Sequence, residues 1–137
     1  QARLDRLESM KAAVAWLKER GLNSIVLGAG PHFGVFVLPK LLQHNKLEGI
    51  DGLMQQFEST KGYQLDELLE PYVKSMGGIY LRKRWFFCPH CLCKVILDNG
   101  ALLMVDSHHL SLDASQAFGL NISREYKSIL TNKLADY

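Results

Sequence analysis

The segment SIVLGAGPHF, residues 24–33, decides the fold. Residues 25–27 are apolar and rich in β-branched side chains, with no polar residue between them. Such a run is typical of a parallel strand that is buried on both faces of its sheet. The glycines that follow predict a loop at the carboxyl end of this strand, where ligands bind in open α/β sheets. The segment therefore predicts an α/β fold with a ligand site near residues 28–33.

The neighbouring segments fit an alternation of helices and strands. An amphipathic helix is expected over residues 3–20, because apolar side chains recur there every three or four residues, at Leu4, Leu7, Met10, Val14 and Leu17. Further helices are predicted in residues 35–42, 47–57 and 65–76, and a short strand is predicted at residues 79–81.

The last third of the chain predicts a hairpin and a capped helix. Strands are expected at residues 94–97 and 102–105, on either side of the turn residues 98–100. Ser111 is expected to N-cap a helix that runs through Phe118 and is stopped by Gly119. Residues 121–134 are expected to add a separate helical piece.

The composition fits one globular domain of 137 residues, of which 47% are hydrophobic and 22% are charged. A formal net charge of +2 argues against a dedicated nucleic-acid binder, which would concentrate basic charge on one face. The apolar runs are shorter than the ~20 residues that a membrane helix needs, and the first residues do not resemble a signal peptide. The chain starts without a methionine, so it is expected to be mature, trimmed or cut from a longer protein.

Asp106 and His109 are the first candidate for chemistry, because an Asp-x-x-His sequence follows a predicted strand directly. An imidazole can take a proton from a nucleophile, and a carboxylate can fix its tautomer and stabilise the imidazolium. Three residues of separation on a tight turn can bring the two side chains together. The alternative is a solvated carboxylate beside a loop histidine. The spacing alone leaves both interpretations open.

The block VDSHHLSLDA, residues 105–114, resembles the last conserved block of SGNH-type hydrolases. It is most similar to the version in the SGNH domain that follows the membrane acyltransferase-3 domain of bacterial polysaccharide O-acetylases. A helix containing Trp16, the strand and loop of residues 25–31, and a pair of nearby cysteines occur in the same order as in that family. One departure is that His32 and Phe33 follow Pro31, and the second proline of the usual loop is lacking.

The resemblance implies a serine esterase or O-acyltransferase that acts on acyl, in particular acetyl, esters of cell-surface polysaccharide. It implies that His109 is the general base and then the acid, that Asp106 orients His109, and that His108 flanks the site. The nucleophilic serine of the family lies in a Gly-Asp-Ser block, which does not occur here and is expected upstream of Gln1. Residues 1–137 are therefore expected to be the C-terminal part of a single SGNH-type domain, inactive without that serine.

The implied fold is a three-layer, flavodoxin-like parallel sheet that is incomplete at its N-terminal side. An incomplete sheet leaves an edge and apolar surface bare, so self-association of the isolated chain is expected. The resemblance also implies an acylated glycan or acyl donor as partner, an upstream membrane domain, a periplasmic location tethered to the inner membrane, and no cofactor or metal. A non-catalytic accessory or binding module is the alternative.

The three cysteines cluster in the sequence CPHCLC, residues 88–93. The run Cys88-Pro89-His90-Cys91 resembles the active site of thiol-disulfide oxidoreductases, but β-like residues follow it instead of the helix that lowers the thiol pKa. Zinc ligation by the three cysteines and a histidine (His90, His108 or His109) is another alternative. Similarity to the paired cysteines of the SGNH family implies a Cys88–Cys93 disulfide, with Cys91 as the spare thiol.

Overall fold

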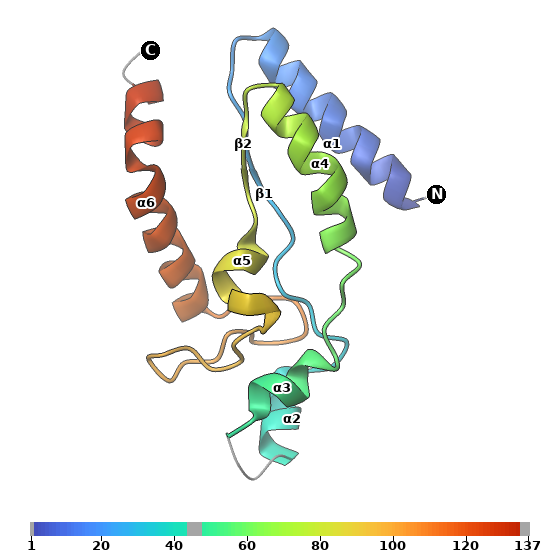
Figure 1. The fold of residues 1–137 in the computed structure, drawn as a ribbon, viewed down its shortest axis with the longest axis vertical. Helices are drawn as coiled ribbons and strands as arrows, with labels where there is room; N and C mark the ends of the chain where they lie inside the picture. Colours follow the sequence, from blue (N-terminus) through green and yellow to red (C-terminus); the bar gives the residue numbers. More distant parts are fainter. Residues whose placement is uncertain (1, 44–47, 135–137) are drawn as a thin grey trace.

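The computed structural model describes residues 2–43 and 48–134 (Figure 1). The elements in chain order are α1 (Ala2–Glu19), β1 (Ile25–Leu27), α2 (Val37–Gln43), α3 (Ile50–Gln55), α4 (Tyr63–Ser75), β2 (Ile79–Leu81), α5 (Lys83–Phe87), the 3₁₀ turn η1 (Pro89–Cys91) and α6 (Leu112–Leu134). The two strands pair in parallel, with Ile25 opposite Ile79 and Leu27 opposite Leu81. The fold therefore mixes helices with a small parallel sheet, consistent with the predicted α/β class.

One hydrophobic cluster joins the helices to the sheet. Helices α1 and α4 lie beside each other on one side of β1 and β2 (Figure 1). The cluster consists of Leu7, Val14, Leu69, Val73 and Tyr80. Leu7 and Val14 belong to the apolar stripe that the sequence predicts for the first helix, and their burial places α1 against α4, whereas Leu4 of the same stripe is exposed.

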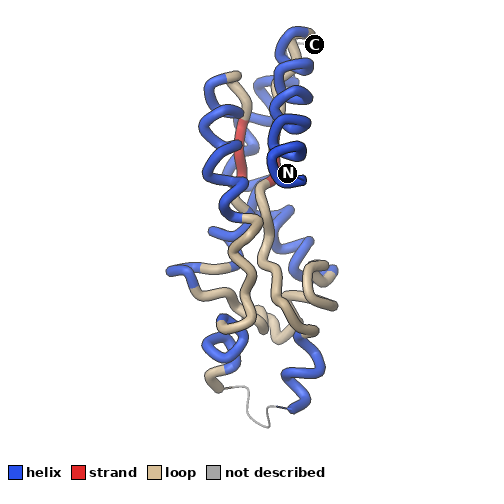
Figure 2. Tube along the Cα trace, turned by 90° about the vertical axis from the view of Figure 1, so that its right-hand side faces the viewer, coloured by secondary structure: helices blue, strands red, loops and turns tan. Residues whose placement is uncertain are grey.

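A second cluster is built from helices α3, α5 and α6 and from the loop segments that Figure 2 shows beyond the two strands. Its buried members are Phe33, Ile50, Met54, Phe87, Cys88, Cys93, Val95, Leu103, Met104, Ala114 and Phe118. They come from segments that are far apart in the sequence, so this cluster ties the loop after β1 to the C-terminal third of the chain.

The expectation that the first strand is buried on both faces is wrong. Ile25 is 46% exposed and Leu27 is 49% exposed, whereas Val26 between them packs against the cluster shared with α1 and α4. Because alternate side chains of a strand point to opposite faces, Ile25 and Leu27 point away from those helices. Within the described residues, β1 pairs only with β2 and is therefore an edge strand.

The predicted hairpin of residues 94–105 forms one isolated bridge, Ile96 with Leu102, while Met104 of its second strand bridges to Leu110 outside it. The turn itself is present, since the Leu97 N–H donates to the Ala101 carbonyl at 2.8 Å. The ladder is interrupted because the Val95 N–H donates instead to the Asp51 carboxylate at 2.7 Å. A side chain from another part of the chain thus replaces regular strand pairing.

The last helix does not stop at Gly119 but continues to Leu134. Phe118 and Ile122 lie four residues apart and both contact the second cluster, so they share one face of α6. Their packing outweighs the ~1 kcal/mol that a glycine costs inside a helix. The predicted helix at residues 47–57 is shorter as α3, which begins after Gly49; residue 47 lies outside the described residues.

The N-cap predicted at Ser111 is confirmed, because its Oγ accepts the Ala114 N–H at 3.1 Å. We expect Ser111→Ala to lower the free energy of unfolding by about 1 kcal/mol, as that backbone N–H loses its partner. Urea denaturation followed by circular dichroism measures this change. Ser115→Ala, at an exposed position inside α6, is the control and should not destabilise the protein. Equal losses in both variants would contradict the capping role.

In the part of the chain that the structure describes, no helix has the length and the apolar composition needed to cross a bilayer.

Candidate active site

The loop that carries Asp106 and His109 is closed by backbone hydrogen bonds. The Val105 N–H donates to the His109 carbonyl at 2.9 Å, and the Ser111 N–H donates to the Leu103 carbonyl at 2.9 Å. The loop therefore connects the buried residues Leu103 and Met104 to the start of α6. Both ends of the loop are anchored in the second cluster.

Asp106 and His109 are in direct contact, with 2.6 Å between Asp106 Oδ2 and His109 Nδ1. The other carboxylate oxygen, Oδ1, accepts the backbone N–H groups of His108 and His109, each at 2.8 Å. These hydrogen bonds, the one from the His108 backbone foremost, hold the pKa of Asp106 far below its ordinary value. The carboxylate is therefore ionised at neutral pH and its orientation is fixed by its own loop.

This contact determines which nitrogen of His109 carries the proton. An ionised carboxylate can only accept hydrogen bonds, so Nδ1 of His109 must donate. In the neutral imidazole, Nε2 is then left as the acceptor, and the side chain is 66% exposed. A ring fixed in this way can accept a proton at Nε2 while Asp106 stabilises the resulting imidazolium.

The loop after β1 lies beside this pair. The Phe33 N–H donates to the Ser107 carbonyl at 2.8 Å, and the His32 ring packs edge-on to the His108 ring with 5.9 Å between centroids. The sequence predicts a ligand site near residues 28–33 but gives no particular role to His32 within it. The signal that could have identified His32 is its position directly after Pro31, where the family pattern has a different loop.

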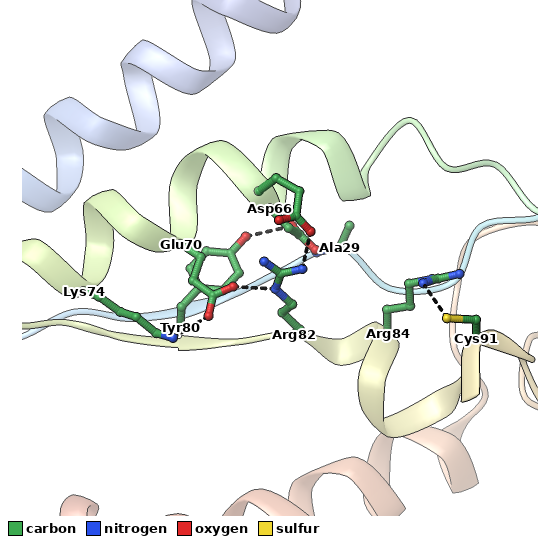
Figure 3. Close-up of polar contacts among 9 residues, drawn as sticks. Ala29, Asp66, Glu70, Lys74, Tyr80, Arg82, Arg84 and Cys91 are labelled. Atoms are coloured by element: carbon green, nitrogen blue, oxygen red, sulfur yellow. Dashed lines mark hydrogen bonds and ion pairs between the residues drawn. The ribbon is translucent and has the colours of Figure 1, made fainter. Parts of the chain in front are cut away.

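The start of that loop is held by α4. Asp66, which is buried, accepts the Ala29 N–H at 3.0 Å and the Tyr80 hydroxyl at 2.7 Å (Figure 3). Gly28 is needed here, because a Cβ at this position would lie 2.9 Å from the Tyr80 ring. Asp66 therefore joins α4, the end of β1 and β2, and it fixes the point from which the site loop departs.

The basic run at residues 82–84 has a structural role. Arg82 forms ion pairs with Glu67 and Glu70 of α4, and Arg84 pairs with Glu58 at 3.3 Å (Figure 3 draws Glu70 with Arg82). These contacts link α5 to preceding segments of the chain.

A serine does not complete the pair within the described residues. Ser107 Oγ lies 2.9 Å from Nδ1 of His108, not from His109. Among the serines whose side chains the structure describes, none has a hydroxyl that forms a hydrogen bond with the His109 ring. This part of the chain thus presents an acid–base pair without a nucleophile.

Cys88 and Cys93 form the disulfide that the family resemblance implied, and both are buried. Because two of the three cysteines are oxidised, the zinc alternative at the cysteine cluster is wrong. The oxidoreductase alternative needs Cys88 paired with Cys91 at the start of an α-helix, whereas Cys88 follows α5 and precedes a single 3₁₀ turn. Cys91 is exposed, and its sulfur lies 4.0 Å from Nη1 of Arg84 (Figure 3).

Comparisons with known proteins establish the fold. No family model and no curated protein match this sequence. Among solved structures, it is similar to the periplasmic domain of a lipopolysaccharide acetyltransferase from Salmonella ser. Paratyphi A, with a TM-score of 0.69 and 17% sequence identity. The match covers 90% of this chain and 49% of that chain, so residues 1–137 span about half of the solved domain.

Proposed function

We propose that residues 1–137 are the C-terminal part of a single SGNH-type domain and supply the Asp-x-x-His half of its catalytic triad. The contact between Asp106 and His109 is the observation that carries this proposal. The enzyme is a serine esterase or O-acyltransferase acting on acetyl esters of cell-surface polysaccharide. The fold that the chain shares with a lipopolysaccharide acetyltransferase domain supports this substrate class.

In the proposed reaction, the nucleophile is a serine from a segment outside residues 1–137. Its oxygen attacks the acyl carbonyl, and Nε2 of His109 accepts the hydroxyl proton. When the tetrahedral intermediate collapses, His109 returns this proton to the departing alcohol and an acyl-serine remains. Water or a sugar hydroxyl then attacks the acyl group, with His109 again accepting and returning the proton. Asp106 keeps its charge throughout and stabilises the imidazolium.

The side of the sheet opposite α1 and α4 could accommodate the segment that carries the serine. Ile25 and Leu27 form a half-exposed apolar row on β1, on the side away from α1 and α4. On that side stands α6 (Figure 1), and a groove of ≈ 320 Å³ lies between β2, α5 and α6, lined in part by Leu81 and Ile122. A further parallel strand, as in a flavodoxin-like sheet, would pair with the unpaired edge of β1 and carry the serine toward His109.

The proposed location is periplasmic, with the domain attached through an upstream membrane acyltransferase domain. Two observations support the location: the solved domain of similar fold is periplasmic, and the Cys88–Cys93 disulfide suits an oxidising compartment.

The isolated chain tests where the serine resides. We expect purified residues 1–137 to hydrolyse p-nitrophenyl acetate no faster than the His109→Ala variant, because the proton acceptor has no serine to activate. A clear rate that depends on His109 would show that the nucleophile lies inside this chain. Upstream coding sequence without a Gly-Asp-Ser block would favour an accessory module instead.

A further inference from the structure

The carboxylate of Asp106 lies between two imidazole rings. Its Oδ2 contacts Nδ1 of His109 at 2.6 Å, and its Oδ1 lies 3.7 Å from Nδ1 of His108. The two rings are stacked at a tilt, with 4.0 Å between their centroids. One carboxylate and two imidazole nitrogens therefore converge on a single point of the surface. The proposed reaction uses only the His109 side of this arrangement.

We propose that Asp106, His108 and His109 also form a binding site for a divalent transition metal ion, of which Zn²⁺ is the representative. One potential ligand atom from each of the three residues lies within 4.8 Å of the others. Tetrahedral zinc with bonds of about 2.0–2.1 Å holds its ligands roughly 3.4 Å apart. The distances of 2.6 and 3.7 Å, measured to the two different oxygens of Asp106, lie on either side of that value, so the side chains would rotate to share one ion.

Binding of the ion would displace one proton and one hydrogen-bond partner from the two imidazole rings. It takes the place of the Nδ1 proton that His109 shares with Asp106, and it displaces the Ser107 hydroxyl, which lies 2.9 Å from Nδ1 of His108. The His108 and His109 side chains are 55% and 66% exposed, so an ion reaches them from solvent without any opening of the fold. Imidazole and carboxylate ligands suit Zn²⁺ and its neighbours.

His32 is placed to provide a fourth ligand. It is exposed and lies edge-on to His108, 5.9 Å away between ring centroids. A rotation of its side chain can bring a ring nitrogen toward the cluster. Occupation of the site would take both the Asp106 carboxylate and Nδ1 away from the acid–base pair, so the metal would act as an inhibitor of the proposed reaction.

Isothermal titration calorimetry of the 137-residue chain with zinc chloride tests the site directly. We expect one ion per chain, and at least about tenfold weaker binding in His108→Ala and in His109→Ala, by analogy with the loss of zinc affinity when a site loses its supporting groups. His32→Ala should weaken binding less. His90→Ala and Cys91→Ser, at exposed positions in the cysteine loop, are the controls and should bind as the unchanged chain does. Circular dichroism verifies that each variant is folded.

Substituting Co²⁺ for Zn²⁺ distinguishes the ligands by spectroscopy. The proposed site predicts a visible absorption of nitrogen- and oxygen-ligated cobalt without a thiolate charge-transfer band. Absence of zinc binding, unchanged affinity in His108→Ala and His109→Ala, or loss of binding in Cys91→Ser would overturn the proposal. None of these outcomes depends on ester hydrolysis, so a negative result leaves the proposed enzymatic function to be judged by its own tests.

Discussion

Replacing His109 by alanine is expected to lower kcat for acetyl-ester hydrolysis by about 10⁴-fold in the longer protein that carries the serine segment. The reason is that the serine would lose the imidazole that accepts its proton. The side chain is exposed, so the loss would not come from unfolding. Steady-state kinetics with p-nitrophenyl acetate measures the effect.

Asp106→Asn should lower kcat by a similar factor, about 10⁴-fold, although it only replaces one carboxylate oxygen by an NH2 group. The amide can donate a hydrogen bond to Nδ1 of His109, which moves the ring proton to Nε2 and removes the acceptor. His90→Ala is the matched control and should retain activity close to that of the unchanged protein, because His90 is exposed and lies in the cysteine loop, outside the loop of Asp106 and His109. Activity of the His109→Ala protein within tenfold of the unchanged protein would contradict the proposed role.

Phe33→Ala is expected to lower the free energy of unfolding by about 3–5 kcal/mol. Phe33 is fully buried at 0% exposure, and it belongs to the cluster that joins the loop after β1 to residues 87–118. Truncation leaves a cavity between segments that regular sheet pairing does not hold together. Urea denaturation monitored by circular dichroism gives the change.

Phe36→Ala provides a matched control three residues away, because Phe36 is 62% exposed. It should change the free energy of unfolding by no more than about 0.5 kcal/mol. Similar losses in the two variants would contradict the position of Phe33 in the core. Since the Phe33 N–H also donates to the Ser107 carbonyl, the same residue connects the stability of this half of the molecule to the position of the loop that carries Asp106 and His109.

Features that depend on local sequence could be predicted. The apolar stripe of residues 3–20 predicted the first helix, the run at 25–27 predicted a parallel strand, and Ser111 was predicted as an N-cap. The structure contains all three. Asp106 and His109 could be proposed as a pair because three residues of separation on a tight turn suffice to bring them together. In each case, the interacting groups are close in sequence or share one periodic face.

Features that depend on distant contacts could not be predicted. Helix α6 continues through Gly119 because Phe118 and Ile122 pack on a cluster assembled from several segments. The hairpin at 94–105 is interrupted because Asp51 binds the Val95 N–H from 44 residues away. His32 reaches His108 only because the loop after β1 folds against the Asp106 loop. No local pattern in the sequence encodes these contacts.

The protonation of His109 can be measured directly by ¹⁵N NMR of the imidazole nitrogens in the 137-residue chain. If the ring is fixed by Asp106, neutral His109 carries its proton on Nδ1, and Asp106→Asn moves that proton to Nε2, while His90 keeps the same spectrum in both proteins. A His109 ring that is protonated on Nε2 in the unchanged chain, or that does not respond to Asp106→Asn, would show that the two side chains do not form a catalytic pair.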